Sequence, residues 1–317
     1  MNNVKSKKIL VAIDGSEYSL AAVRYASAML NPKTTQVVLL HALRKIDDAF
    51  WNIGMKRAVW ERMVDIKGWE AAQDEAVQKI MDESRQAFVD RGYPKDAVKE
   101  VIHRCKNGVA REIVEESKGD YHTVFLGRKG VSALKDLVMG GTAQKLIERT
   151  THIPACVVGK QVRPGNLLVA LDGSEGAMRA VEHVGLMFGD TEIEVTLIHV
   201  IRDVASFVPS YGMTYPGPIT TSPEDLVEEE KREMHHVFED AKSKLIAAGM
   251  DEKKISWRVI TDVSSRAAVM IREAQKAGHG GVVVGRRGLS KLDEFFMGSM
   301  SNKVVHLGKD TAVWVVS

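Results

Sequence analysis

Short apolar runs recur along the first half of the chain, and polar positions separate them. The run at residues 8–13, KILVAI, shows no alternation of apolar and polar side chains. Such a run is typical of a strand that is covered on both faces. Further runs that predict strands lie at residues 37–41, 98–103, 123–126 and 153–158.

Between these runs the apolar residues follow a helical period. Leu20, Val23 and Ser27 share one helix face, and Ser16 lies where it can cap that helix. A longer inner face is formed by Val77, Ile80, Met81, Ser84 and Phe88. Further helices are expected at residues 110–118 and from about residue 142. Strands separated by helices predict an α/β fold with a mainly parallel sheet and right-handed crossovers.

The second half repeats the first at a spacing of 158 residues. Asp172-Gly173-Ser174 repeats Asp14-Gly15-Ser16, and His199 repeats His41 at the same spacing. Agreement over so many positions indicates an internal duplication. The repeat predicts two domains, residues 1–160 and 166–317, joined by a linker in which Pro164 breaks any regular element.

Two long stretches carry no regular pattern, at residues 47–70 and 203–225. Stretches of this length are unusual inside a compact domain and are often lids or partner surfaces. We therefore expect them to respond to a ligand.

Composition narrows the class of protein without fixing its chemistry. Of 317 residues, 44% are hydrophobic and 27% charged, which is typical of globular domains. A net charge of +2 gives no indication of a nucleic acid or membrane partner, and no apolar run is long enough to span a bilayer. Two cysteines form no disulfide framework, which predicts a reducing, cytoplasmic location.

The most informative stretch is residues 282–303, VVVGRRGLSKLDEFFMGSMSNK, with a near copy at residues 124–145. Gly285 follows an apolar run, where the absence of a side chain lets another molecule approach the backbone. Gly288 can adopt a positive φ, and Gly298-Ser299 begins a helix with unpaired N–H groups. This arrangement suits a phosphate group. The alternative is that the glycines serve only as turns and helix ends, but their repetition favours an anion site.

At this point the chain resembles the universal stress protein family in its tandem form. The family pattern G-x2-G-x9-G-[ST] is matched by Gly285, Gly288, Gly298 and Ser299. The resemblance implies two Rossmann-like, five-stranded parallel-sheet domains of the adenine nucleotide alpha hydrolase type, related by a pseudo-twofold. It also implies a site for ATP with Mg²⁺ at the carboxyl ends of the strands.

Carried over by resemblance, the nucleotide contacts start at the ends of the first two strands and continue along the glycine loop. In the second domain these residues are Ala170, Asp172, Val200, Gly285, Arg286, Arg287, Gly288, Gly298, Ser299 and Met300. In the first domain they are Ala12, Asp14, Ala42, Gly127, Arg128, Lys129, Gly130, Gly140, Gly141 and Thr142. Asp172 is also a candidate for holding the Mg²⁺ ion.

The first domain departs from the family pattern. Gly141 replaces the expected serine or threonine, Thr142 comes one position late, and Ala143 stands where the second domain has Ser301. A lost hydroxyl to a charged phosphate costs about 1.5–3 kcal/mol. We therefore expect the second domain to bind nucleotide more tightly than the first.

Several residues permit a structural as well as a functional interpretation. Asp172 could contact the ligand or only its own turn. His41 and His199 could act as acid–base groups, but histidines at the end of apolar runs more often pack in a core. No Gly-Lys-[Ser/Thr] sequence follows the glycines, so the pattern of fast phosphotransferases is absent.

The sequence therefore favours a cytoplasmic, ATP-binding regulatory or stress-response protein that is not an enzyme, with at most slow ATP hydrolysis. Two alternatives stay open: an adenylating or pyrophosphatase-type enzyme of a related fold, and a nucleotide-free dimeric scaffold. The partners expected are an adenine nucleotide and unidentified proteins, with a homodimer left open and neither nucleic acid nor membrane. The resemblance also implies that the last strands of the two domains pair antiparallel. Cys156 and Trp314 hold equivalent positions in these strands and differ greatly in volume, as an asymmetric packed contact would use.

Overall fold

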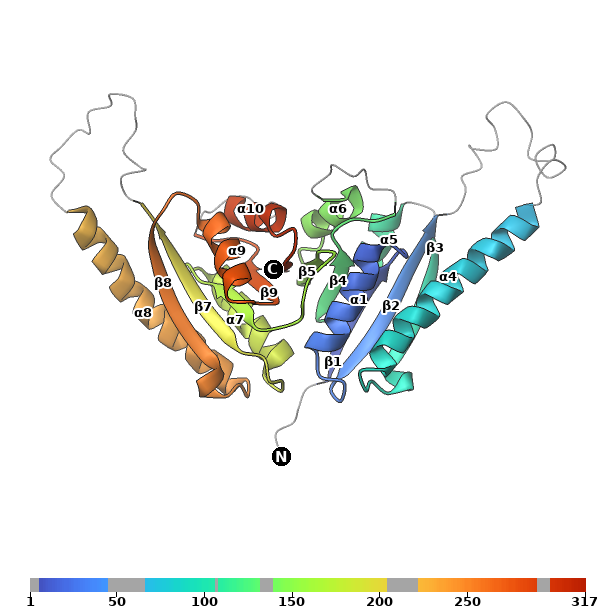
Figure 1. Cartoon of the computed structure of the whole chain (residues 1–317), viewed down its shortest axis with the longest axis horizontal. Helices are drawn as coiled ribbons and strands as arrows, with labels where there is room; N and C mark the ends of the chain where they lie inside the picture. The colour runs from blue at the N-terminus through green and yellow to red at the C-terminus, as the bar shows by residue number, and fades with distance from the viewer. Residues whose placement is uncertain (1–5, 45–65, 106–107, 132–138, 204–221, 290–296) are drawn as a thin grey trace, which may run out of the picture.

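A computed structural model describes residues 6–44, 66–105, 108–131, 139–203, 222–289 and 297–317. Figure 1 shows two similar halves on either side of the middle of the molecule, with a long helix on each outer flank. No helix among the described residues combines the length and the apolar content needed to cross a membrane.

The first half alternates strands and helices along the chain, as the pattern predicts. Its elements are β1 (Lys7–Ile13), α1 (Glu17–Met29), β2 (Thr35–Arg44), α4 (Ile66–Val89), the short 3-10 helix η1 (Lys95–Ala97), β3 (Val98–Cys105), α5 (Val109–Glu116), β4 (Thr123–Gly127), α6 (Gly141–Arg149) and β5 (Ala155–Val158).

The second half repeats this order. Its elements are β6 (Leu167–Ala170), α7 (Glu175–Phe188), β7 (Val195–Arg202), α8 (Pro223–Ala247), the 3-10 helix η3 (Glu252–Lys254), β8 (Ile255–Val263), α9 (Arg266–Lys276), β9 (Gly281–Gly285), α10 (Ser299–Leu307) and β10 (Ala312–Val316). Residues 159–166, between β5 and β6, form neither helix nor strand.

All ten strands belong to one sheet in the order β3-β2-β1-β4-β5-β10-β9-β6-β7-β8. Neighbours within each half run parallel, which confirms the expected pair of five-stranded parallel sheets. The one antiparallel pair joins β5 to β10, with Trp314 opposite Cys156. From either edge of the sheet towards its middle, equivalent strands of the two halves follow in the same order. This arrangement confirms the expected pseudo-twofold.

Helices cover both faces of the sheet, as in doubly wound folds. One face packs against α1, α4, α7 and α8, and the other against α5, α6, α9 and α10. Because both faces are covered, most strand residues are buried, which explains the apolar runs without alternation.

The two stretches predicted as irregular are shorter than expected. Helix α4 begins at Ile66 and α8 begins at Pro223, so residues 66–70 and 223–225 are helical. Ser222 caps α8 and accepts a hydrogen bond from the N–H of Asp225 at 3.1 Å. Residues 45–65 and 204–221 lie outside the described residues, and so does the lid role predicted for them.

Candidate functional site

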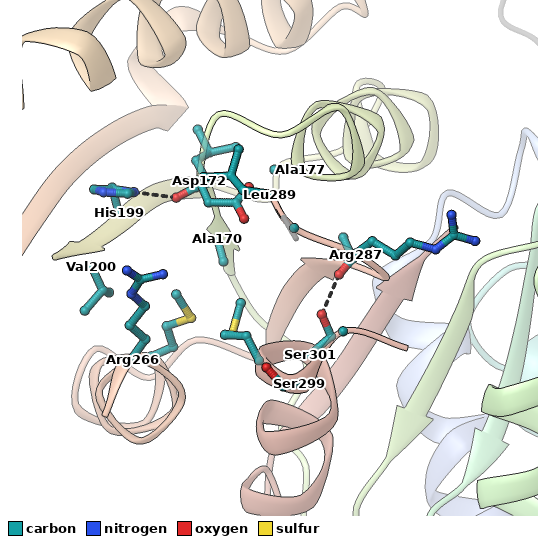
Figure 2. A pocket seen from close by; sticks show the side chains of 16 residues that line it. Ala170, Asp172, Ala177, His199, Val200, Arg266, Arg287, Leu289, Ser299 and Ser301 are labelled. Atoms are coloured by element: carbon teal, nitrogen blue, oxygen red, sulfur yellow. Dashed lines mark hydrogen bonds between the residues drawn. The ribbon is translucent and has the colours of Figure 1, made fainter. Parts of the chain in front are cut away.

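A cavity of ≈ 200 Å³ lies in the second half at the carboxyl ends of β6, β7 and β9. The first turns of α7, α9 and α10 close its other sides, as Figure 2 shows. Nine of the ten residues predicted for this domain line the cavity: Ala170, Asp172, Val200, Gly285, Arg287, Gly288, Gly298, Ser299 and Met300. Parallel strands bring their carboxyl ends to one edge, so residues more than 100 positions apart in sequence meet here.

The first half has a cavity in the equivalent place, of ≈ 510 Å³. Nine of the ten residues predicted for this domain line it: Ala12, Asp14, Ala42, Gly127, Lys129, Gly130, Gly140, Gly141 and Thr142. We refer to this as the first cavity and to the one in the second half as the second cavity.

The prediction is wrong for the tenth residue of each set, Arg128 in the first half and Arg286 in the second. Both side chains are buried, at 1% and 3% exposure, and neither lines its cavity. Each follows the last residue of a strand, so its side chain points the opposite way from its neighbour and enters the contact between the halves. We withdraw the prediction that their charge faces a phosphate.

The two buried guanidinium groups cross between the halves in a reciprocal way. Arg128 donates to the carbonyl oxygens of Val305 at 2.6 Å and Gly308 at 2.5 Å, at the end of α10. Arg286 donates to the carbonyl oxygens of Ile147 at 2.5 Å and Glu148 at 2.8 Å, at the end of α6.

These contacts suit a buried cation. Burial lowers the pKa of Arg128 to about 10, and burial also lowers the pKa of Arg286. Both therefore remain charged near neutral pH and complement the negative ends of the helix dipoles.

The next loop residue, Arg287, does line the second cavity. In Figure 2, however, its side chain extends away from Ala170 and Val200. Lys129 holds the same place in the first half, and its Nζ lies 6.0 Å from the centre of the Tyr18 ring.

The glycines of the loops are needed for a reason that the sequence analysis missed. Gly130 and Gly288 are not among the described glycines with positive φ, so that part of the prediction is wrong. A Cβ at Gly288 would lie 2.4 Å from Oδ2 of Asp172, and one at Gly130 would lie 2.5 Å from Oδ2 of Asp14. These positions exclude a side chain because the loop lies against the aspartate.

Gly285 and Gly127 likewise permit a close approach, but by the chain itself. A Cβ at Gly285 would lie 2.5 Å from the backbone of Gly176 in α7, and one at Gly127 would lie 2.6 Å from the backbone of Ser19 in α1. The missing side chains let the first turn of a helix pack directly on the end of a strand. Those helix starts therefore contribute to the wall of each cavity.

Asp14 and Asp172 each accept hydrogen bonds from their own turn through Oδ1. Oδ1 of Asp172 accepts hydrogen bonds from the backbone N–H of Ser174 at 3.1 Å and from its hydroxyl at 2.5 Å. Asp14 accepts from the N–H of Ser16 at 3.0 Å through Oδ1, and from the N–H of Val131 at 3.1 Å through Oδ2. The structural interpretation of these aspartates is thus correct for Oδ1, while Oδ2 of Asp172 faces the glycine loop.

The helices α6 and α10 begin in a way that leaves donors available. Serines cap α1, α7, α8 and α9 and accept a hydrogen bond from the first turn of the helix. By contrast, α6 is capped by Gly140 and α10 by Gly298, with no side-chain hydrogen bond at either cap. Among the described residues, no side chain accepts from the N–H groups of these first turns, which suits an anion. That an anion binds there stays a prediction.

Ser301 proves to have a local role. Its hydroxyl, which is 2% exposed, donates to the carbonyl oxygen of Gly285 at 2.7 Å and ties α10 to the end of β9. Ala143 at the equivalent position cannot make this bond. Ser299, the first residue of α10, is exposed at the cavity, and its counterpart Gly141 lacks the hydroxyl.

His199 lines the second cavity but is held by two acceptors. Nδ1 donates to the carbonyl oxygen of Leu171 at 2.7 Å, and Nε2 lies 2.9 Å from Oε1 of Glu230. Both ring nitrogens of His199 therefore already have partners within the protein, which supports a positioning role for this side chain. Its counterpart His41 is also buried, and burial lowers the pKa of His41.

Arg266 is a site residue that the sequence analysis missed. It is the first residue of α9, and its side chain rises beside Val200 in Figure 2. Its Nε has no hydrogen-bond partner among the described residues. The loop after β8, the third strand of this half, ends at the same edge of the sheet as the cavity. The position of that loop in the sequence could therefore have indicated Arg266 as a site residue. The repeat concealed it, because the equivalent first residue of α5 in the first half is Val109, which carries no charge.

Arg266 also joins the second cavity to a smaller one of ≈ 150 Å³. Arg202 and Lys303 line this smaller cavity, together with the cap Ser265 and with Ser299. With Ser264, three basic side chains and three hydroxyls therefore line this smaller cavity, which adjoins the second cavity at the start of α10. Among the described residues, no group of three or more His, Cys, Asp and Glu side chains could hold a metal ion.

Comparisons with known proteins agree with this architecture. The sequence model of the universal stress protein family matches residues 5–158 and again 165–316. The chain is 29% identical over 146 residues to universal stress protein YxiE of Bacillus subtilis, spanning 44% of this chain and 91% of that protein. It is 23% identical over 316 residues to a universal stress protein of Mycolicibacterium smegmatis, spanning 97% and 96%. A crystal structure of a universal stress protein from Archaeoglobus fulgidus covers 98% of both chains with a TM-score of 0.60 at 18% identity.

Proposed function

The chain belongs to the universal stress protein family, and from that premise we propose that it is a regulatory protein that binds ATP in its second cavity. One observation carries the proposal. Helix α10 begins at a glycine cap without a side-chain acceptor, and it opens into a cavity that also holds the Nε of Arg266 without a described partner. Unpaired backbone donors and a guanidinium together suit a polyanion.

The apolar part of the cavity suits a base. Ala170 and Val200 lie at the ends of adjacent strands, and Met270 and Met300 lie across from them. Methionine side chains adapt to flat aromatic ligands. An adenine placed there would leave its ribose near Asp172 and its phosphates toward Ser299 and Arg266.

Magnesium would accompany the nucleotide and neutralise part of the phosphate charge. Asp172 is the acidic residue among the described residues that line the second cavity, so its Oδ2 would face the ion or the ribose. Because both ring nitrogens of His199 are already engaged by Leu171 and Glu230, the cavity favours holding ATP over cleaving it rapidly. We propose a nucleotide-dependent regulatory role with at most slow hydrolysis, in the cytoplasm, where the two buried free cysteines would stay reduced.

Isothermal titration of the full chain with ATP and with adenosine, in the presence of Mg²⁺, tests this function. We expect Arg266→Gln to weaken ATP binding about tenfold, since a hydrogen bond to a charged group contributes about 1.5–3 kcal/mol. Adenosine binding should be unchanged because adenosine carries no phosphate. Arg272→Gln is the matched control, since Arg272 lies on the same helix α9, has a side chain that is 59% exposed, and lines none of the three cavities described.

The alternatives predict different results. A scaffold would bind neither ligand, and mass spectrometry of the gently denatured protein would release no nucleotide. An adenylating or pyrophosphatase-type enzyme would convert bound ATP with stoichiometric release of pyrophosphate. Equal weakening of ATP and adenosine by Arg266→Gln would show that Arg266 supports the fold and does not contact phosphate.

A further inference from the structure

The reciprocal arginines connect the two cavities through two helices. Arg286 lies directly between Gly285 and Arg287, which both line the second cavity, yet its guanidinium holds the last turn of α6. The first turn of α6 lies in the first cavity at Gly141 and Thr142. A residue of one loop therefore anchors the phosphate-facing helix of the other half.

The mirror arrangement holds in the other direction. Arg128 lies between Gly127 and Lys129 of the first cavity and anchors the last turn of α10. The first turn of α10 supplies Ser299 to the second cavity. Figure 1 shows α6 and α10 on either side of the middle of the molecule, where both contacts form.

Each helix is short enough to carry a displacement from one end to the other. Both have nine residues, which corresponds to about 13 Å at 1.5 Å per residue. The carbonyl groups of a last turn lack partners within the helix, and each arginine satisfies two of them. Because these hydrogen bonds are buried and charge-assisted, water does not replace them easily.

We propose that Arg128 and Arg286 are positioning residues that couple the two cavities, so that a nucleotide bound in one half changes the affinity of the other. This inference rests on the proposed nucleotide binding. A ligand that orders one glycine loop also fixes the arginine beside it, and the arginine then fixes the helix that binds phosphate in the opposite cavity. Binding at one site should therefore tighten binding at the other, in the range of about 5–150-fold that coupled sites show.

Single-site variants allow each cavity to be measured alone. Gly288→Val places a side chain against Asp172 and blocks the second cavity, while Gly130→Val places one against Asp14 and blocks the first. ATP with Mg²⁺ is then titrated calorimetrically into each variant, with and without Arg286→Met. We expect Arg286→Met to weaken the first cavity about tenfold and to leave the second nearly unchanged, and Arg128→Met to show the converse.

Lys7→Met is the matched control. Lys7 is also a buried cation, at 3% exposure, that crosses between the halves: it donates to the carbonyl oxygen of Met187 at 3.0 Å and pairs with Asp190. Its partners belong to neither glycine loop and to neither of the two helices. Lys7→Met should lower the free energy of unfolding without changing the ATP affinity of either cavity. If only the arginine variants weaken ATP binding in the cavity of the opposite half, the arginines act by positioning and not by general destabilisation.

A second measurement does not depend on the arginine variants folding. In the chain with neither cavity blocked, the first cavity should bind ATP more tightly than in Gly288→Val, because the filled second cavity holds α6 in place. Equal affinities in the two proteins, or an Arg286→Met effect confined to its own cavity, would overturn the coupling while ATP binding itself persists. Absence of ATP binding in every variant would instead reject the proposed function.

Discussion

Burial fixes the charge state of single side chains in the middle of this molecule. His183 lies in α7 at the contact between the halves, where a hydrogen bond of 3.0 Å joins its Nε2 to the hydroxyl of Thr123. Its ring centre is 6.0 Å from that of Trp314. Burial lowers the pKa of His183 from 6.5 to about 3, so the folded protein keeps this ring neutral.

This lowered pKa predicts a dependence of stability on pH. Between pH 6.5 and about 3 the unfolded chain binds a proton at His183 that the folded chain does not, so stability falls as pH falls. From pH 7 to pH 5 the loss should be about 2 kcal/mol from this residue. Urea unfolding of the wild type and of His183→Gln at both pH values measures it.

The comparison between the two proteins isolates His183, because all other titrating groups are shared. The free energy of unfolding of His183→Gln should fall less between pH 7 and pH 5. An equal fall in both proteins would mean that His183 is protonated in the folded state or absent from the linkage.

For single residues, the position of the site was predictable from the sequence, but the directions of its side chains were not. The family resemblance, carried onto the repeat, identified nine lining residues in each half. Arg286 and Arg287 are adjacent and alike in sequence, and only packing between the halves decides which one is buried. Arg266 was missed because its counterpart at the start of α5 is the uncharged Val109, so a search guided by the repeat passed over it.

The helices α6 and α10 differ at their first residues, which line the two proposed nucleotide sites. α10 begins with Ser299, whose side chain is exposed at the second cavity, whereas α6 begins with Gly141. A Cβ added at Gly141 would meet no atom within 4 Å, so a serine fits there without displacing the backbone. The first half thus has room for the hydroxyl that it lacks.

We therefore expect Gly141→Ser to tighten nucleotide binding in the first cavity. A hydroxyl that reaches a charged phosphate contributes about 1.5–3 kcal/mol, which is roughly tenfold or more in affinity. Titration with ATP in the Gly288→Val background, where only the first cavity is open, measures the gain.

The control is Gly141→Ala in the same background. Alanine stiffens the start of α6 as serine does but brings no hydroxyl, so it separates the effect on the helix from the hydrogen bond. If alanine tightens binding as much as serine, the difference between the two halves lies in the helix and not in the missing hydroxyl.

The elements themselves were largely predictable, since each apolar run became a strand, although the edge strand β3 is only partly buried. The run at residues 8–13 corresponds to β1, Lys7–Ile13, and the run at residues 98–103 to β3, Val98–Cys105. The start of α4 was placed too late, because Gly68 and the scattered tryptophans hide its period in the sequence. A helix held by tertiary packing can begin before its own pattern is clear.

At the scale of the whole molecule, one tryptophan belongs to the cores of both halves. Trp314, 1% exposed, makes edge-to-face contacts with Phe125 of the first half at 5.1 Å and Phe188 of the second at 5.4 Å between ring centres. Its Nε1 donates to the hydroxyl of Tyr25 at 3.2 Å. Its loss should therefore affect both halves together.

We expect Trp314→Ala to lower the free energy of unfolding by about 3–5 kcal/mol, as for other fully buried large side chains. The matched control is Trp257→Ala, since Trp257 is 42% exposed and its ring contacts are with Phe238 and His235 of α8 in the second half. Urea unfolding followed by circular dichroism compares the two. Similar losses for both variants would contradict a shared core around Trp314.

The joining of the two sheets could not be derived from the hydrophobic pattern. An apolar run predicts a buried strand but does not say which neighbour covers its edge. The antiparallel pairing of β5 with β10 was expected only from the family resemblance, and the structure confirms it. Cys156 and Trp314 indicated asymmetry at this place because their volumes differ so much.

That asymmetry bears on how the chain could have arisen from a single ancestral unit. Cys156 and Trp314 are equivalent residues that lie opposite each other on the pseudo-twofold axis, so two copies of the second half would bring two indoles onto one spot. Two copies of the first half would leave a hollow where one indole now stands. Each half has thus become the dedicated complement of the other, and covalent fusion guarantees that the matched pair, rather than either self-pair, assembles.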